Sequence, residues 1–562
     1  MLPAARLRWF SWLLAAWAGV VVLRLAHVQI LKHSAWEAEA ARQREQSREV
    51  EELRGSIISR DGRLLAGSLE RVSLCVNPRK IAREQRAAVA ASLAPLADQP
   101  RDEIERQLAA HDGFFYLAKD LDPAVADAVG RLRQRGVDTE RSERRLYPHG
   151  TLAGATVGFV SAEGRGQAGV EAFYDRTLRG VPSVFRVLRD GKSLPTQLDY
   201  RLETPGRPGQ SVVLAIDCRV QQLVEEELAA TLREVGGKGA SAVVMEAGSG
   251  ELLAVASIPS FDPAHVGDVA PEIRHNRAVE DALEPGSTFK PIIVAAALSV
   301  GALTAGELVN CSGGGIEVAD VFIRDHARYG LLPVWDVLAK SSNVGAIRIA
   351  QRLSAAQLDD VIRRLGFGQL THVELPAEAR GIYRSPAHWS ALSRASLAIG
   401  QEISVTPLQL AQAYAAIANG GLLVQPTLVL ETRDRDGQRL TPNHPRVPTR
   451  VLPREVATAL AAMLETVVEQ GTGRAAAVPG FRVAGKTGTA QKPFAGSYQA
   501  GHHAAWFVGF FPLPDPRLVL VVCVDEPQRD FWAADVAAPA FGRIARRLTL
   551  LLGLPPNLGA LA

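Results

Sequence analysis

The chain has 562 residues, 47% of them hydrophobic and 22% charged, which is typical of a folded protein with two or three domains. Its formal net charge is only +3, and its basic residues form no tract interleaved with aromatic ones, so nothing indicates a nucleic-acid-binding protein. The four cysteines have no regular spacing, which argues against a metal site or a disulfide framework. We therefore expect isolated buried thiols, no metal and no cofactor.

A long apolar segment lies near the amino terminus. Residues 9–31 carry one charge, Arg24, and at about 1.5 Å per residue a helix of this length crosses a hydrocarbon core of about 30 Å. Arg6 and Arg8 precede it, which predicts a cytoplasmic tail, a single transmembrane helix and an extracytoplasmic remainder. A cleaved signal peptide is the alternative, because Ala16-Trp17-Ala18 has the small-x-small pattern of a cleavage site. Cleavage there would leave an apolar mature end.

The next part of the chain contains no recognisable catalytic constellation. Residues 32–53 are rich in Ala, Glu, Gln and Arg, and we expect a charged helix there. A short strand and a turn at Asp61-Gly62 follow, and short strands and helices alternate beyond them. The Pro- and Gly-rich residues 204–209 resemble a linker. We interpret residues 32–205 as a non-catalytic pedestal domain and residues 206–562 as a second domain.

The order of elements in the second domain predicts an α/β (α+β) fold. Buried strands form a hairpin early in this domain, three more lie near its end, and helices separate the two groups. An antiparallel sheet covered by helices follows from this order. The expected strands are 211–216, 240–246, 251–258, 481–489, 504–511 and 518–524, and the expected helices are 288–300, a run opening at 341–343, and 537–552.

The sequence Glu-Pro-Gly-Ser-Thr-Phe-Lys at residues 284–290 places Ser287 and Lys290 three residues apart at the start of the expected helix. A serine hydroxyl needs an adjacent base to act as a nucleophile at neutral pH, and a lysine can be that base once burial or a second cation lowers its pKa. We therefore interpret Ser287 as a nucleophile. A serine and a lysine on one helical turn are more often a solvated face, so this pattern alone is weak.

Two further patterns follow in order, and each occurs once. They are Ser341-Ser342-Asn343 and Lys486-Thr487-Gly488-Thr489. The three patterns in this order are typical of penicillin-binding proteins and class A β-lactamases. Structural alternatives stay open at single positions: Ser341 could cap the helix that follows, Thr487 could be an ordinary strand residue, and Gly488 could serve only close backbone approach.

Residues 480–487 also match the phosphate-binding loop pattern letter for letter, which would make Lys486 a nucleotide ligand. That loop needs a buried strand before it and a helix that begins at its Lys-Thr. Here Pro479 precedes the pattern, and Gly488 and Pro493 oppose a following helix. We therefore expect Lys486 on a strand.

With these motifs, the chain resembles the class B penicillin-binding proteins, in particular septal peptidoglycan transpeptidases of the FtsI type. Glu284 before Pro-Gly is more similar to division enzymes than to elongation enzymes. Two departures are Ser59, where the family commonly has an acid, and Trp532-Ala533-Ala534, where it often has an aromatic residue and glycines. Supporting stretches are 54–57, 169–171, 214–217, 284–291, 471–473 and 484–490.

The resemblance implies a serine acyl-enzyme mechanism. Ser287 would attack the carbonyl between the terminal D-alanines of a stem peptide, with Lys290 as its base, and an amine of a neighbouring stem would take the acyl group. Ser341 would pass a proton to the leaving amine, and Asn343 would hold Lys290 and the substrate amide. The remaining implied roles are fixed positive charge from Lys486, carboxylate binding by Thr487 and Thr489 beside Gly488, and an oxyanion hole from the backbone N–H groups of Ser287 and Thr489.

The resemblance also implies partners and a location. We expect peptidoglycan stem peptides and β-lactams as ligands, and a SEDS-type (FtsW-like) glycan polymerase and other division proteins as partners. The catalytic domain would lie in the periplasm, anchored to the bacterial inner membrane. The alternatives are an elongation-type class B transpeptidase, a carboxypeptidase or β-lactamase that uses water as the acceptor, a penicillin-sensing receptor, and a non-catalytic division scaffold.

Overall fold

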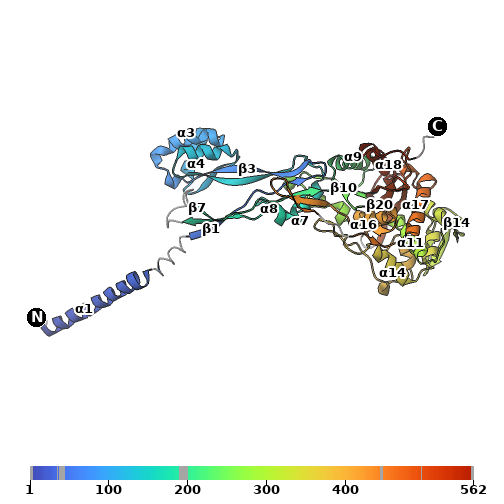
Figure 1. Ribbon diagram of the computed structural model, residues 1–562, viewed down its shortest axis with the longest axis horizontal. Coiled ribbons are helices and arrows are strands. Elements are labelled where there is room, and N and C mark those ends of the chain that lie inside the picture. Colours follow the sequence, from blue (N-terminus) through green and yellow to red (C-terminus); the bar gives the residue numbers. More distant parts are fainter. Residues whose placement is uncertain are drawn as a thin grey trace. The chain divides into compact units, whose positions relative to one another are not determined.

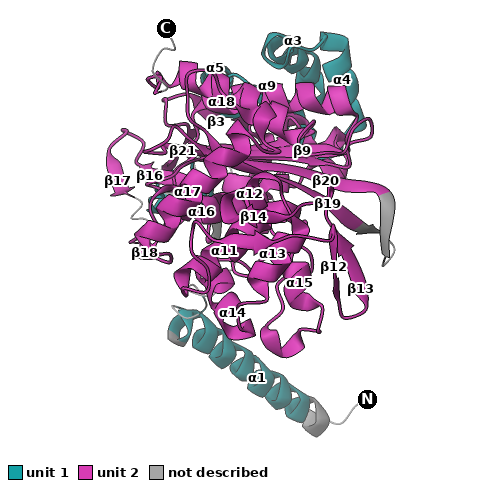
Figure 2. Cartoon of the chain, turned by 90° about the vertical axis from the view of Figure 1, so that its right-hand side faces the viewer, with its two compact units in different colours: residues 1–53, 69–144, 179–209 teal, residues 54–68, 145–178, 210–562 magenta. Residues whose placement is uncertain are grey.

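The computed structural model describes residues 4–33, 36, 45–188, 200–442, 447–494 and 497–557 (Figure 1). The chain divides into two compact units, and each unit is discontinuous in sequence (Figure 2). Unit 1 comprises residues 1–53, 69–144 and 179–209, and unit 2 comprises residues 54–68, 145–178 and 210–562. The boundary at residue 205 stays a prediction, but the segments 54–68 and 145–178 associate with the carboxy-terminal part of the chain rather than with the pedestal.

Unit 1 contains a helical layer on a sheet. The helices α3 and α4 contact each other, and α3 contacts β4, which pairs antiparallel with β3. Leu74, Val76, Leu93 and Leu108 are among the buried residues of its core. A second sheet has the order β1-β6-β7. The bounds are β1 Glu45–Val50, β3 Leu64–Val76, α3 Arg86–Ala97, α4 Arg101–Ala110, β4 Phe115–Leu121, α5 Ala124–Leu132, β5 Val137–Leu146, β6 Ser183–Leu188 and β7 Tyr200–Thr204.

The charged helix expected over residues 32–53 is wrong at its carboxy-terminal end. Residues 45–50 form β1, which pairs antiparallel with β6 from Glu45↔Leu188 to Val50↔Ser183. The ladder hydrogen bonds of this pairing override a local composition that favours a helix, as tertiary context commonly does. Residues 34–35 and 37–44 of the same expectation lie outside the described residues.

Unit 2 is built on a five-stranded antiparallel sheet with the order β10-β9-β21-β20-β19. This confirms the antiparallel sheet that the sequence predicts, and it leaves β19 as a terminal strand. The hairpin β9–β10 and the three late strands join because β21 pairs with β9 from Leu518↔Glu246 to Asp525↔Gly239. The bounds are β9 Gly239–Glu246, β10 Leu252–Ile258, β19 Ala484–Phe494, β20 Ser497–Phe511 and β21 Leu518–Asp525.

Helices cover both faces of this sheet, so its strands are apolar on both sides (Figure 2). On one face, α9 and α18 pack over alternate strand residues such as Val244, Leu520 and Val522. On the other, α11 and α16 bury the intervening residues, such as Val243 and Val521. The bounds are α9 Cys218–Val235, α10 Arg277–Glu280, α11 Lys290–Ser299, α12 Val334–Ala339, α13 Asn343–Ala350, α14 Ala355–Arg364, α15 Ser393–Ala398, α16 Pro407–Ala418, α17 Arg454–Glu469 and α18 Ala537–Leu551.

Further strand pairs complete unit 2. The strand β8 pairs with β16 and, in parallel, with β2, and the other pairs are β16 with β17, β11 with β14, β12 with β13, and β15 with β18. The bounds are β2 Ile57–Ile58, α6 Gly154–Val157, α7 Gly169–Phe173, α8 Asp175–Arg179, β8 Ser211–Leu214, β11 Leu308–Asn310, β12 Gly315–Val318, β13 Val321–Arg324, β14 Leu331–Pro333, β15 Leu422–Leu423, β16 Val429–Arg433, β17 Arg439–Pro442 and β18 Thr449–Arg450.

A buried ionic cluster explains why the amino-terminal segments belong to unit 2. Glu171, whose side chain is fully buried, accepts hydrogen bonds from Arg54 Nε at 2.7 Å and from Arg145 Nε at 2.7 Å. Arg54 also donates to Asp175 at 2.7 Å and to the Glu171 carbonyl at 2.8 Å. The cluster therefore fastens residues 54–68 to residues 145–178 through charge-assisted bonds.

The first helix, α1 Ala4–Ala26, continues as a π-helical turn over His27–Leu31. The span from Arg8 to Ile30 is long and apolar enough to cross a membrane, and among the described residues it is the one helix that passes this test of length and composition. This agrees with a membrane anchor, although a signal sequence has the same character.

Candidate active site

Ser287 lies on a 3₁₀ turn, Gly286–Phe289, that leads directly into α11. The expected helix is present, but its α-helical part begins at Lys290 rather than Thr288. Pro291, near the start of α11, has no N–H and fits a first turn, so the preceding residues take the tighter winding. The Ser287 side chain is half-buried.

Glycine is required where this turn meets the sheet. Gly286 has φ +53°, and a Cβ there would lie 2.9 Å from the Thr489 carbonyl oxygen. A Cβ at Gly488 would lie 2.5 Å from the Pro285 carbonyl oxygen. The two glycines therefore let the turn that carries Ser287 lie directly against β19.

Lys290 is completely buried and points at the Ser-x-Asn motif. Its Nζ donates to the Ser341 carbonyl at 2.5 Å and to Asn343 Oδ1 at 2.8 Å, and it lies 3.2 Å from Ser341 Oγ. Burial lowers the pKa of Lys290 to about 7, and the negative charge of Asp325 opposes that shift. Lys290 can therefore exchange a proton near neutral pH.

The hydroxyl of Ser341 lies between two lysines. Lys486 Nζ donates to Ser341 Oγ at 3.0 Å, opposite Lys290. The alternative in which Ser341 caps the following helix is wrong, because Ser342 is the cap: its Oγ accepts from Gly345 N at 2.9 Å. Ser341 instead has φ +55°, a strained conformation for a non-glycine residue. That conformation turns its hydroxyl toward the two ammonium groups.

Asp325 holds the Ser-x-Asn motif in place, and sequence reasoning missed it. Its carboxylate accepts a hydrogen bond from Ser342 Oγ at 2.7 Å, from Val344 N at 3.1 Å, and from Asn343 N. Asp325 follows β13 and is contiguous with none of the motifs. No local pattern in the sequence identifies an acidic residue that accepts hydrogen bonds from the backbone N–H groups at the start of a helix 18 residues away.

Lys486 lies inside β19, so the phosphate-loop alternative is wrong: no helix begins at this Lys-Thr pair. The side chain is completely buried and also donates to the Thr487 carbonyl at 3.1 Å. Burial first, and the nearby charge of Lys290 second, hold the pKa of Lys486 well below its usual range. The repulsion between the two ammonium groups favours a state in which one of them is neutral.

The two threonines of the Lys-Thr-Gly-Thr motif are each held by a second element. Thr487 Oγ1 and Thr472 Oγ1 are 2.7 Å apart, and Thr489 Oγ1 accepts from Ala533 N at 2.9 Å. Thr472 belongs to residues 471–473, which support the family resemblance in the sequence but have no role assigned to them there. The motif residues 287, 290, 341, 343 and 486–489 therefore come from the 3₁₀ turn Gly286–Phe289, from α11, from the start of α13 and the residues just before it, and from β19.

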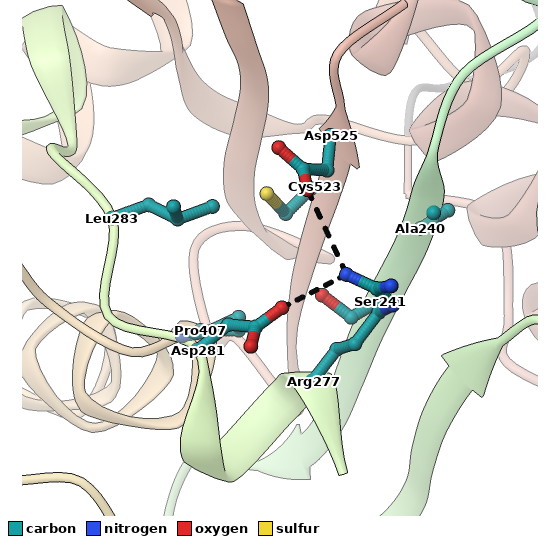
Figure 3. Close-up of a pocket in the computed structure, with 9 residues that line it drawn as sticks. Ala240, Ser241, Arg277, Asp281, Leu283, Pro407, Cys523 and Asp525 are labelled. Carbon is teal, nitrogen blue, oxygen red and sulfur yellow. Dashed lines mark hydrogen bonds and ion pairs between the residues drawn. The ribbon is translucent and has the colours of Figure 1, made fainter. Parts of the chain in front are cut away.

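A small cavity on the same sheet is too small to be a substrate site. Its volume is about 10 Å³, close to that of a single water. Arg277 projects into it between Asp281, at 3.0 Å, and Asp525, at 3.6 Å (Figure 3). Lys492, near the end of β19, pairs with Asp525 at 2.6 Å. These ion pairs tie β19, β21 and α10 together.

Within the described ranges, no group of three or more His, Cys, Asp or Glu side chains is arranged to hold a metal ion. His502, part of the His-His pair in β20, contacts Glu526 at 3.2 Å. The four cysteines are buried and none forms a disulfide, as the sequence predicts.

Comparison with known proteins matches both parts of the chain. The family model of the penicillin binding protein transpeptidase domain matches residues 240–546, and that of the penicillin-binding protein dimerisation domain matches residues 49–214. Peptidoglycan D,D-transpeptidase FtsI of Escherichia coli is 31% identical over 562 residues, covering 97% of this chain and 93% of that protein. The probable peptidoglycan D,D-transpeptidase PenA of Neisseria gonorrhoeae is 33% identical over 507 residues, covering 90% and 85%.

Solved structures are also similar to this chain over most of its length. Penicillin binding protein 3 of Mycobacterium tuberculosis, in a crystal structure with aztreonam, superimposes with a TM-score of 0.72 at 29% identity, covering 91% of this chain and 98% of that one. A peptidoglycan synthetase of Bifidobacterium adolescentis superimposes with a TM-score of 0.79 at 25% identity, covering 92% and 99%.

Proposed function

The chain belongs to the class B penicillin-binding proteins of FtsI type, and on that basis we propose how its residues divide the work of the reaction. It is a serine-type peptidoglycan D,D-transpeptidase of septal cell-wall synthesis, and it binds β-lactams. One observation carries the assignment of roles: the Ser341 hydroxyl lies within hydrogen-bonding distance of both Lys290 and Lys486, beside the turn that carries Ser287.

In the acylation step, neutral Lys290 takes the hydroxyl proton of Ser287, and Ser287 Oγ bonds to the carbonyl carbon between the terminal D-alanines. The backbone N–H groups of Ser287 and Thr489 stabilise the developing oxyanion, where losing one donor typically costs about 3 kcal/mol. The C–N bond then breaks. Ser341 gives its proton to the leaving amine and recovers one from protonated Lys290, 3.2 Å away.

In the transfer step, the amine of a second stem peptide attacks the Ser287 ester. The amine loses a proton through Ser341 to Lys290, the C–O bond breaks, and Ser287 regains its proton. One acyl group passes from the donor to the acceptor, so the reaction needs no cofactor. An amine acceptor distinguishes this reaction from the hydrolysis of a carboxypeptidase or a β-lactamase.

The remaining residues hold the substrate. Asn343 donates its amide to the Arg324 carbonyl and accepts from Lys290, which fixes its side chain for contact with the substrate amide. Thr487 and Thr489 offer hydroxyls to the terminal carboxylate, and Lys486 supplies positive charge behind them. Gly488 leaves room for the backbone on either side of Ser287.

The apolar span of α1 anchors the protein to the bacterial inner membrane, with residues 1–8 in the cytoplasm and the catalytic unit in the periplasm. Arg6 and Arg8 before the span support this orientation. A SEDS-type (FtsW-like) glycan polymerase and other division proteins are the partners that this role requires. Residues 32–205 are the part of the chain that we expect to contact them.

Labelling with a fluorescent penicillin tests the proposal. We expect the detergent-solubilised full chain to gain one adduct by intact mass, located at Ser287 by peptide mapping, and the Ser287→Ala variant to gain none. Ser299→Ala, at the other end of α11, should label like the wild type because the Ser299 hydroxyl makes no hydrogen bond to any described residue. A folded wild-type protein that does not label would contradict the assignment. Product analysis with a donor peptide and an amine acceptor separates transfer from hydrolysis.

A further inference from the structure

Two aromatic rings from distant parts of the chain meet beside the catalytic residues. The His326 imidazole and the Trp532 indole have centroids 5.0 Å apart and planes inclined by 80°, the edge-to-face arrangement that aromatic pairs prefer. His326 is exposed, and the exposed fraction of the Trp532 surface is 42%. Neither ring is therefore held in place by a surrounding core.

Each ring is attached to a different side of the site. His326 follows Asp325, whose carboxylate binds the backbone N–H groups at the start of α13, where Asn343 lies. Trp532 precedes Ala533, whose N–H donates to Thr489 Oγ1 on β19. The ring contact therefore joins the Ser-x-Asn segment to the Lys-Thr-Gly segment.

The position of His326 within the site is supported by its electrostatic surroundings. Although His326 as a whole is exposed, its imidazole is partly desolvated; this desolvation, and then the positive charge of Lys290, lower the pKa of His326, with Lys486 acting in the same direction and Asp325 opposing. On the other side, Phe531 stacks on His503 at 4.5 Å and contacts Trp532 at 4.9 Å, so Trp532 belongs to a row of rings.

We infer that His326 and Trp532 form an aromatic bridge that must open before an acyl donor can bind between Asn343 and Thr489. This inference rests on the proposed function, because the donor's amide and carboxylate are placed between the same two segments. The bridge is a specificity device. It slows acylation by every donor and slows it more for donors that cannot stack on an exposed indole.

Measuring second-order acylation constants with a fluorescent penicillin tests the bridge. We expect His326→Ala and Trp532→Ala each to raise the constant about two- to tenfold, the range that corresponds to one aromatic pair. The double variant should be no faster than the faster single variant, because the second substitution removes a contact that is already lost. Trp532→Phe keeps an aromatic face and should fall between wild type and Trp532→Ala.

Trp335→Ala is the matched control, since Trp335 is exposed to a similar extent, 40%, and should leave the constant unchanged. Single variants that acylate at the wild-type rate or more slowly, or effects that add in the double variant, would overturn the bridge. If Trp532 only held β19 in place, the effects of the two substitutions would add in the double variant, because His326→Ala leaves the contacts of β19 unchanged. Wild-type labelling at Ser287 with unchanged variant rates rejects the bridge alone, whereas loss of wild-type labelling rejects the proposed function.

Discussion

The burial of Lys290 sets the protonation state on which acylation depends. Because its pKa is lowered to about 7, the neutral base form is the minor form below pH 7 and the major form above it. We expect the acylation rate to rise with pH through about 7. The measurement is the second-order acylation constant from pH 5.5 to 9, and a flat profile would contradict the role of Lys290 as base.

Lys290→Arg completes this test. Arginine stays charged at every accessible pH and cannot accept the Ser287 proton, so we expect a loss of at least about 100-fold without a pH midpoint. Lys340→Arg is the control. Lys340 is half exposed, pairs with Asp336 at 2.9 Å, and should tolerate the same exchange.

Asp325 illustrates a residue whose effect has two separable parts. Its charge raises the pKa of Lys290 against burial, so Asp325→Asn should move the pH midpoint of acylation below that of the wild type. It also accepts hydrogen bonds at the start of α13, so the same variant should lose about 1–2 kcal/mol of unfolding free energy. The pH profile and denaturant unfolding measure the two effects. A midpoint that moves upward would exclude the electrostatic part.

At the scale of elements, the contact between the Ser287 turn and β19 determines where the nucleophile stands. In Gly488→Ala the new methyl group would overlap the Pro285 carbonyl and the Thr288 backbone nitrogen, at 2.5 and 2.9 Å. The turn must move away, and a displacement near 1 Å costs about 100-fold in rate. We expect acylation to fall by about that factor while the far-ultraviolet circular dichroism is retained.

Gly248→Ala, in the turn between β9 and β10, is the control for Gly488→Ala because a Cβ there meets nothing within 4 Å. A Gly488→Ala variant that acylates at the wild-type rate would show that β19 and the turn can separate without consequence.

Sequence and structure agree where the chemistry is contiguous. Short sequence motifs contain the main site residues, and the spacing within each motif predicts which side chains share a turn or a strand. These residues are Ser287, Lys290, Ser341, Asn343 and Lys486. Asp325 and Trp532 reach the site only through tertiary contacts, and no periodicity encodes those. The strand at residues 45–50 was missed for the same reason: its partner, β6, lies more than 130 residues along the chain.

The Ser-x-Asn motif does not predict which of its two serines caps the following helix. A serine before a helix is an ordinary cap, and the sequence offers two adjacent serines for that position. Only the backbone decides between them. A positive φ at Ser341 turns it toward the lysines and leaves the capping position to Ser342.

For the whole molecule, the buried cluster around Glu171 holds the amino-terminal segments of unit 2 in place. Glu171→Gln would remove the carboxylate that pairs with Arg145 and one of the two that pair with Arg54, and breaking a buried ion pair in this way typically costs about 3–5 kcal/mol. We expect a loss of that size in denaturant unfolding. We also expect earlier proteolytic cleavage in residues 54–68.

Glu163→Gln is the control for Glu171→Gln, because Glu163 is exposed and its carboxylate accepts a hydrogen bond from Ser161 rather than from the buried cluster. Equal stability of the two variants would show that the cluster is not what fastens these segments.

The terminal position of β19 has a consequence for what this enzyme can recognise. The sheet order ends at β19, so among the described strands none pairs with its outer edge, and main-chain donors and acceptors remain available there. A stem peptide is itself an extended chain and can add to that edge as one more strand. Recognition through the main chain reads the direction and extension of a peptide rather than its side chains. At this edge, recognition therefore depends on the backbone of the donor, and a rigid mimic of its last two residues can occupy the same place.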